Sequence, residues 1–224
     1  MPSPVPTNPR KLPQQDRSKV TVEAILIATA RILIEEGYDK ASTNRIAERA
    51  GISIGSLYQY FPNKESLIAA LRDRHVSSMM ATIESKLKDL DNAPIEVVLP
   101  ELVRANIAAH AIEPVLHKVL HEQVPRLKET ESENRMTKLL QNYLAKQCDR
   151  TQLHNLDCIV FVIERTIEAL THAAVIERPE LLQDRQIEQE ISQMLLHYLE
   201  QKLAPLPWDL PSPSAEIGKV ESAD

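Results

Sequence analysis

Hydroxyl and amide side chains gather in a short stretch, residues 53–60, where the chain carries no carboxylate. Aspartate and glutamate are missing from every position between Arg49 and Lys64. Hydroxyl and amide groups can hydrogen bond to base edges or phosphates, and the lack of acidic neighbours removes repulsion from a polyanion. The polar side chains of the stretch are Ser53, Ser56, Tyr58, Gln59 and Tyr60. The pattern indicates a nucleic-acid contact surface; the alternative is a small helical corner whose aromatic rings only pack.

The residues before and within this stretch have the spacing of a helix-turn-helix. The motif needs small residues where two helices touch, a glycine in the turn and an apolar residue after the turn. Ala47, Gly51 and Ile52 meet these needs. We therefore expect a helix that a serine caps at position 42 and that ends at Ala50, followed by a short helix over 54–60.

The stretch from Val22 to Leu71 resembles the N-terminal domain of TetR-family transcriptional regulators. The resemblance is carried by Ile25, Leu26 and Ala28, by Glu36-Gly37-Tyr38, by the run IAERAGIS at 46–53 and by the run GSLYQYFPNKESL at 55–67. It covers about fifty consecutive residues. Two positions depart from the family pattern: Tyr60 stands where many members have histidine, and Asn63 where serine or aspartate is frequent.

The resemblance implies a dimeric DNA-binding protein, mostly a repressor, that a small molecule releases from a near-palindromic operator. By position, it assigns phosphate contacts to Thr43, Arg45, Tyr58 and Lys64. It assigns contacts with base edges or nearby backbone to Ser53, Ile54, Ser56 and Gln59, with Tyr60 at the groove wall. For Arg45 the alternative is a surface salt bridge with Glu48 or Glu65. For the whole protein the alternative is a DNA-binding activator without a ligand.

Composition predicts an all-α fold. The chain has 224 residues but four glycines, and none lies between Ser56 and Ile217. Because β-turns depend on glycine, a β-rich fold is close to excluded. Two cysteines, Cys148 and Cys158, are too few for a disulfide framework and fit a reducing cytoplasm. Unreactive free thiols are the simpler expectation for them, and a redox switch is the alternative.

Charge is spread unevenly along the chain. The net charge is −6, but residues 1–74 carry 11 Lys and Arg against 8 Asp and Glu, whereas the remainder carries 15 against 24. A polyanion is therefore expected to contact the N-terminal third. The sequence has no run of eighteen apolar residues and no secretory signal, so we expect no membrane contact.

Periodicity and proline positions predict about nine helices in four regions. Residues 1–16 and 204–224 are proline-rich and are expected to be flexible arms. Residues 17–65 are the expected helix-turn-helix domain, and 66–203 the expected ligand-binding and dimerisation domain. Besides the helix-turn-helix pair, the expected helices run from Asp16 or Ser18 to Gly37 and over Asn63–Leu90, Ala93–Glu113, Pro114–Gln123, Pro125–Gln147, Asn155–Glu177 and Arg185–Lys202.

The last two long helices are expected to form a homodimer interface. Over 155–177, an apolar row from Leu156 to Ala174 is joined by a second from Ile159 to Ala173, and the final helix carries a third stripe. A helix that is apolar over more than half of its girth needs partners on two sides. A four-helix bundle across a two-fold axis would provide them, and a buried central helix in a monomer is the alternative.

A cavity for an unidentified small-molecule effector is expected among helices 93–113, 125–147 and 155–177, as the resemblance suggests. Residues that could point polar or aromatic groups into it are Asn106, His110, Tyr143, Phe161, Glu164, Arg165, Glu168 and His172. The alternative is that Phe161, Glu164 and Glu168 lie on the solvated side of their helix. A rival class, an all-α enzyme, would use Glu164, Glu168 and His172 as acid and base groups, but no nucleophile or cofactor motif accompanies them.

Two further histidines invite a metal hypothesis. His117 and His121 are four residues apart on one short helix and could hold Zn²⁺ together with His110 or Glu113. No third ligand follows at a known spacing, so we expect neither a metal site nor a cofactor.

Overall fold

The computed structural model describes residues 16–122, 134–147, 155–182 and 184–203. Over these residues the chain forms nine α-helices, one 3₁₀ helix and no strand, so the all-α prediction is confirmed. The elements are α1 (Asp16–Glu36), α2 (Thr43–Ala50), α3 (Ile54–Tyr60), α4 (Lys64–Leu87), α5 (Ile95–His110), α6 (Pro114–Glu122), α7 (Asn134–Gln147), α8 (Leu156–Ile176), η1 (Pro179–Leu182) and α9 (Gln186–Leu203). The expected proline-rich arms lie outside the described residues, except Asp16, which begins α1.

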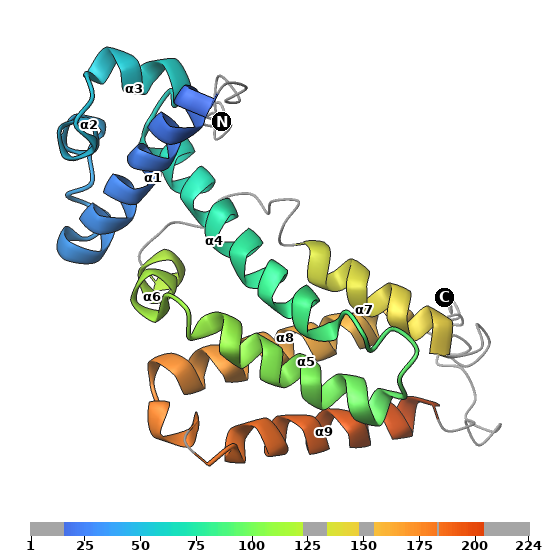
Figure 1. The fold of residues 1–224 in the computed structure, drawn as a ribbon. Coiled ribbons are helices and arrows are strands. Elements are labelled where there is room, and N and C mark those ends of the chain that lie inside the picture. The colour runs from blue at the N-terminus through green and yellow to red at the C-terminus, as the bar shows by residue number, and fades with distance from the viewer. Residues whose placement is uncertain (1–15, 123–133, 148–154, 183, 204–224) are drawn as a thin grey trace, which may run out of the picture.

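Helices α1, α2 and α3 and the start of α4 enclose one hydrophobic core (Figure 1). Ile25 and Leu33 of α1, Ile46 of α2 and Leu57 of α3 are fully buried in it. Phe61, directly after α3, is also buried in this core. Burying one such side chain stabilises the fold by about 1.5–3 kcal/mol, so this core fixes the orientation of the short α3.

Helix α4 leaves this N-terminal core and runs into the C-terminal helices (Figure 1). It begins with a capping box: the side chain of Asn63 accepts the backbone N–H of Ser66 at 2.8 Å, and the Ser66 hydroxyl accepts the backbone N–H of Asn63 at 3.4 Å. The helix ends at Leu87 rather than at Leu90, because the chain turns there and the Leu90 N–H donates to the Leu87 carbonyl oxygen. Helix α4 is therefore one continuous helix that belongs to both halves of the protein.

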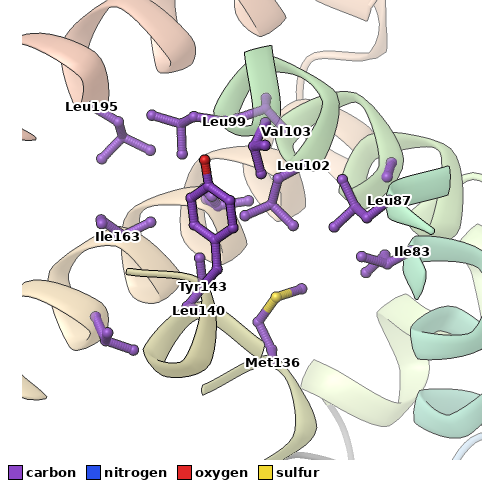
Figure 2. Packing of buried hydrophobic residues seen from close by; sticks show 14 of the residues in the cluster. Ile83, Leu87, Leu99, Leu102, Val103, Met136, Leu140, Tyr143, Ile163 and Leu195 are labelled. Atoms are coloured by element: carbon purple, nitrogen blue, oxygen red, sulfur yellow. The ribbon is translucent and has the colours of Figure 1, made fainter. Parts of the chain in front are cut away.

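The second half of α4 packs with α5, α7, α8 and α9 around a second hydrophobic core. Figure 2 shows Leu102 of α5, Ile163 of α8 and Leu195 of α9 gathered around the ring of Tyr143, which comes from α7. The Tyr143 hydroxyl donates to the Ala93 carbonyl oxygen at 2.6 Å. This bond satisfies the polar end of a largely buried side chain and ties α7 to the turn before α5.

Helix α6 belongs to the N-terminal core although it follows α5 in the chain. Its side chains Leu116, Val119 and Leu120 are buried in the same cluster as α1, α2 and α3. The helix also contacts α8. It is therefore a second link, beside α4, between the two halves of the protein.

The expected bounds of the other C-terminal helices hold to within a few residues. For α7, the described helix begins at Asn134, whereas the sequence predicts a start at Pro125; positions 125–133 lie outside the described residues. Among the described residues, every helix is too short or too polar to cross a bilayer.

Candidate functional site

The turn between α2 and α3 has the geometry of a helix-turn-helix. The side chain of Ser42 accepts a backbone N–H of the first turn of α2 at 3.4 Å. Gly51 ends the helix with φ of 69°, a left-handed conformation that a side chain disfavours. The N–H groups of Gly51 and Ile52 return to the carbonyl oxygens of Glu48 and Ala47 at 3.1 and 3.0 Å. These bonds hold the two helices at a fixed angle.

The polar side of α3 faces solvent. The buried Leu57 marks the inward side of the helix, and Ile54 packs partly against the same core. Of the five polar residues singled out in the sequence, Ser53, Tyr58 and Gln59 are exposed and Ser56 is half-buried, whereas the half-buried Tyr60 packs against the same core. The arrangement leaves hydroxyl and amide groups free of covering protein over one side of the helix.

Two hydroxyl pairs organise this surface. The Thr43 hydroxyl of α2 and the Tyr58 hydroxyl of α3 lie 3.1 Å apart. Ser53 caps α3 by accepting the Ser56 N–H at 3.1 Å, and the two serine hydroxyls are 2.8 Å apart. A hydroxyl both donates and accepts, so each pair can turn a donor toward an outside oxygen.

The two cations assigned to phosphate already have partners within the chain. Arg45 forms a salt bridge with Glu36 of α1. The alternative expectation of a salt bridge with Glu48 or Glu65 therefore named the wrong partners. Lys64 donates to the Tyr38 carbonyl oxygen at 3.0 Å, and its ammonium lies 3.7 Å from the centre of the Tyr38 ring. The Arg45 pair is at the surface, where a salt bridge contributes little and exchanges readily for another anion. The half-buried Lys64 contacts a neutral carbonyl and an aromatic ring.

Sequence reasoning missed the residues that brace these groups. Arg49 donates to both carboxylate oxygens of Glu35 at 2.6 and 2.7 Å, which ties α2 to α1. Tyr38 holds Lys64 in place at the start of α4. The run Glu36-Gly37-Tyr38 was the available signal for Tyr38, but spacing alone did not show that its ring would lie under Lys64.

A cavity of about 300 Å³ lies between α4, α5 and α7. Its lining is mostly leucine, isoleucine and valine, with some charged side chains. The lining residues are Glu84, Leu87, Lys88, Leu90, Asp91, Ile95, Val98, Leu99, Leu102, Leu139, Leu140, Asn142, Tyr143 and Lys146. Figure 2 shows five of these side chains, from Leu87, Leu99, Leu102, Leu140 and Tyr143. Its size is at the low end of the range for small-molecule sites. Helix α4, rather than the expected helix over 155–177, forms the third wall of the cavity.

The eight residues expected around an effector do not lie together in the structure. Tyr143 lines the cavity. Phe161 is 59 % exposed, with the Arg165 guanidinium 5.8 Å from its ring centre. Glu164 accepts a hydrogen bond from the Thr137 hydroxyl at 2.7 Å. The remaining four, Asn106, His110, Glu168 and His172, lie at the junction of α5, α6 and α8, away from the cavity lining.

Five histidines meet at that junction, on α4, α5, α6 and α8. We call them the histidine cluster: His75, His110, His117, His121 and His172. Ring centres are 3.9 Å apart for His121 and His172, 4.4 Å for His110 and His117, and 5.1 Å for His117 and His172. Sequence reasoning missed His75, because only the fold brings α4 against α6.

Burial governs the charge of this cluster. It lowers the pKa of His75 and His172, and it lowers the pKa of His117 to about 3, with the neighbouring His110 adding to that effect. These three rings are therefore neutral at pH 7. Glu168 has an oxygen 3.5 Å from His110 Nε2. Burial opposes ionisation of Glu168, but the surrounding histidines outweigh it and lower the pKa of its carboxyl group.

Comparison with known proteins identifies the class that this fold and interface define. Residues 25–71 match the family described as bacterial regulatory proteins, tetR family, and residues 94–199 match the tetracyclin repressor-like C-terminal domain. The chain belongs to the TetR family of transcriptional regulators and is a helix-turn-helix regulator. It is not an enzyme, so the alternative that used Glu164, Glu168 and His172 in catalysis is wrong.

Individual relatives match either the N-terminal part or the fold. The HTH-type transcriptional activator FasR of Mycolicibacterium smegmatis is 33 % identical over 78 residues, which are 35 % of this chain and 34 % of FasR. The match thus spans about a third of that curated relative. A TetR-family regulator from Streptomyces coelicolor has a TM-score of 0.60 at 24 % identity, covering 82 % of this chain and 99 % of that one. NalD of Pseudomonas aeruginosa, described as the secondary repressor of a multidrug efflux pump, has a TM-score of 0.61 at 18 % identity, covering 80 % and 96 %. At these identities the solved structures show a shared fold.

Proposed function

We propose that the protein is a dimeric repressor that binds a near-palindromic operator through two α3 helices and leaves it when a small molecule occupies the cavity between α4, α5 and α7. The observation that carries this proposal is the solvent-exposed polar side of α3. The hydrogen-bonded turn before α3 and the buried core beneath it hold this side in place. One such helix contacts few base pairs, and each base pair contributes about 1–3 kcal/mol of discrimination. Two copies are therefore needed for a useful preference.

The proposed DNA contacts divide into two groups. Thr43, Arg45, Tyr58 and Lys64 contact phosphates, while Ser53, Ile54, Ser56 and Gln59 lie against base edges or nearby backbone, with Tyr60 at the groove wall. The adjacency of the Thr43 and Tyr58 hydroxyls supports a shared phosphate contact. Arg45 and Lys64 would exchange their present partners for phosphate, which the exposed Arg45 salt bridge permits at small cost.

Exposed apolar side chains on α8 and α9 support a dimer through these two helices. Ile159, Val160 and Ile163 on one side of α8 are buried in the chain's own core. Two apolar side chains of α8 are exposed, Phe161 at 59 % and Leu170 at 36 %, and they lie on different sides of the helix. Met194 of α9 is a further exposed apolar side chain, at 48 %. A second copy that packs against these two helices would bury such groups and form a four-helix bundle.

The switching proposal rests on the continuity of α4. This helix contributes Leu67, Ile68 and Leu71 to the N-terminal core and Glu84 and Leu87 to the wall of the cavity. A mainly apolar molecule that prefers one tilt of α4 would change the spacing of the two α3 helices. A ligand without such a preference would leave DNA binding unchanged.

A titration of labelled DNA tests the core of this proposal. Fragments that tile the region upstream of the gene are titrated with the full chain, and fluorescence anisotropy is followed at several salt concentrations. We expect one near-palindromic fragment to bind about 10³-fold or more tightly than the others, with an affinity that falls steeply as salt rises. Equal affinity for all fragments, or no dependence on salt, would contradict the proposal.

The cavity can be tested with 1-anilinonaphthalene-8-sulfonate, a fluorescent apolar probe. We expect the probe to bind the wild-type chain and to weaken its binding to the preferred fragment. Replacing Leu139, a half-buried residue of the cavity wall, with Trp fills the space and should reduce probe binding several-fold. Val97→Trp, at an exposed position on α5 outside the lining, is the matched control. Equal probe binding by both variants would argue against the cavity as the effector site.

The direction of regulation has a second candidate. FasR, the relative named above, is described as an activator, while NalD is described as a repressor. Activation by this chain would show as loss of transcription from the neighbouring promoter when the gene is deleted, and repression as a gain. The site geometry for DNA binding is the same in both cases.

A further inference from the structure

We propose that His110, His117 and Glu168 form a site for a divalent transition-metal ion of the zinc type, and that this ion fixes α6 against the C-terminal domain. One ligand atom from each of the three residues lies within 4.8 Å of the other two. The residues come from α5, α6 and α8, so the site closes only when three helices are packed together. Spacing in the sequence could not reveal it.

The separations match a tetrahedral ion with little movement. An ion at 2.0–2.1 Å from nitrogen and oxygen ligands places neighbouring ligand atoms about 3.3 Å apart. His110 Nε2 and the Glu168 carboxylate oxygen are already 3.5 Å apart. The other separations are within 4.8 Å, so binding an ion would draw these ligand atoms closer together.

Hydrogen bonds fix the ring of His110 in the state that binds metal. Its Nδ1 lies 2.9 Å from the Asn106 carbonyl oxygen, which can only accept, so Nδ1 carries the proton. When this ring is neutral, its Nε2 carries an unprotonated lone pair. A backbone carbonyl that orients a ligating histidine in this way is a common outer partner in metal sites.

A relay of three residues fixes the ring of His117 in the same way. His75 Nδ1 lies 3.3 Å from a carboxylate oxygen of Glu113, and His75 Nε2 lies 3.1 Å from His117 Nδ1. Because the carboxylate only accepts, His75 donates through Nδ1 and accepts through Nε2. His117 therefore donates through Nδ1, and its Nε2 is left as a lone pair. His75 is thus a positioning residue rather than a ligand.

Both of these lone pairs are buried without a hydrogen-bond donor. His110 Nε2 and His117 Nε2 are closed off from solvent, and neither has a hydrogen-bond partner among the residues that the structure describes. A buried polar atom left in this state destabilises the fold. A proton on His110 would pair with Glu168 and satisfy one atom, but His117 Nε2 would still lack a donor. A metal ion satisfies both atoms and the carboxylate together.

The ligand set also selects the class of ion. Two imidazole nitrogens and one carboxylate suit Zn²⁺, Co²⁺, Ni²⁺ or Cu²⁺, whereas Mg²⁺ and Ca²⁺ prefer oxygen ligands. Ions of this class bind the neutral form of histidine and the ionised form of glutamate. Three protein ligands leave a fourth position for water or another ligand.

The position of the site would couple metal to the DNA-binding helices. His117 lies on α6, and the same helix buries Leu116, Val119 and Leu120 in the N-terminal core. His75, which orients His117, lies on α4, the other link between the two halves. An ion that draws His117 toward α5 and α8 therefore acts on both links. This coupling rests on the proposed function, whereas metal binding itself does not.

Titration of the metal-free full chain with Co²⁺ and Zn²⁺ tests the site. We expect one ion per chain, a visible absorption band typical of tetrahedral Co²⁺, and displacement of Co²⁺ by Zn²⁺. Glu168→Gln keeps the size of a partly exposed side chain and should weaken binding at least 10-fold; His117→Gln should do the same. His197→Gln, at an exposed histidine of α9, is the matched control and should bind as wild type. Circular dichroism checks that each variant is folded.

Wild-type affinity in Glu168→Gln, or no tetrahedral Co²⁺ band in the wild-type chain, would overturn the site. DNA anisotropy with and without Zn²⁺ then tests the coupling, and we expect at least a fivefold change in affinity that Glu168→Gln abolishes. An unchanged affinity in a chain that binds the ion would overturn the coupling and leave a structural site. A chain that bound the ion but showed no preference for any DNA fragment would contradict the proposed function and leave the metal site intact.

Discussion

The hydroxyl oxygens of Thr43 and Tyr58 lie 3.1 Å apart, so the first turn of α2 and the exposed side of α3 are joined through their side chains. The first residue starts the supporting helix and the second lies in the middle of the proposed recognition helix. An exposed hydroxyl pair of this kind gains a stronger acceptor when a phosphate replaces one of the partners. We therefore expect this hydroxyl pair to contribute to the affinity for DNA rather than to the preference for one DNA sequence.

Replacing Tyr58 with Phe removes this hydroxyl and keeps the ring. A hydrogen bond to a charged group contributes about 1.5–3 kcal/mol, so we expect binding to every DNA fragment to weaken about 10-fold or more. The unfolding midpoint should change little, because Tyr58 is 40 % exposed. Tyr198→Phe on α9 is the control and should bind as wild type. Anisotropy titrations on preferred and scrambled fragments measure both, and a loss confined to the preferred fragment would contradict the assignment.

Gln59 should act on preference instead. Its exposed amide can pair with a base edge, and a good amide–base pair is worth about 1–3 kcal/mol of discrimination. Gln59→Ala should therefore reduce the ratio of preferred to scrambled affinity by about 5-fold or more. Gln193→Ala, at an exposed glutamine of α9, should leave the ratio unchanged. An equal loss on all fragments from both Gln59→Ala and Tyr58→Phe would refute the division into base and phosphate contacts.

The sequence predicted the helix-turn-helix more fully than the C-terminal half, and the reason is the range of the interactions. Ser42, Gly51 and Leu57 act within a few residues of their own position, as a cap, a left-handed turn and an inward face. Their roles can be read from spacing. The cavity depends on how far α4 lies from α5 and α7, and no local pattern encodes that distance. Tyr143 was found because its ring is long enough to reach any neighbouring helix, whereas the leucines of the wall carry no signal.

The histidine cluster shows the same limit. His117 and His121 share a helix, so their spacing was visible, but His121 is not in the ligand set that the fold brings together. Glu168 was expected at an effector cavity, and His110 was expected there or, in the zinc hypothesis, beside His117; packing places both beside His117. Only the crossing of α5, α6 and α8 could reveal the combination.

Two glycines of the helix-turn-helix should respond in opposite ways to alanine. Gly51 has φ of 69°, and alanine there should destabilise the fold by about 1–2 kcal/mol, although nothing lies within 4 Å of an added Cβ. Gly55 lies inside α3, and an added Cβ would meet only the Ser53 hydroxyl at 3.9 Å. Gly55→Ala should stabilise α3 by about 0.5–1 kcal/mol. Urea unfolding of both variants measures the difference, and a stability loss in both would show that crowding rather than backbone conformation dominates.

Phe161→Glu should prevent dimer formation. The substitution replaces an exposed apolar side chain of α8 with a charge, which burial against a second copy would desolvate. The monomer should stay folded, because Phe161 is 59 % exposed in the single chain. Ile34→Glu, at a similarly exposed apolar position on α1, should remain dimeric. Sedimentation velocity separates the two states, and a dimer that persisted in Phe161→Glu would move the interface away from this side chain.

The stability of the metal-free protein should fall as pH falls below about 6.5. An unfolded histidine titrates near 6.5, whereas burial lowers the pKa of His117 to about 3 and also lowers those of His75 and His172. Between these values the unfolded chain binds protons that the folded chain does not, so protons favour unfolding. The groups that face these rings are Arg74, Glu113 and Glu122 beside the cluster, together with Glu168.

The loss of stability should be visible as a lower urea midpoint at pH 5.5 than at pH 7.5, with a chelator present at both. Glu168 works in the same direction at lower pH, because its lowered pKa makes the folded chain bind fewer protons than the unfolded one below about 4.5. His117→Leu removes the most strongly shifted ring and should reduce the difference between the two midpoints. His197→Leu, at an exposed histidine, should keep the full difference. A midpoint that rose on acidification would mean that protonated histidines pair with Glu168 in the folded state.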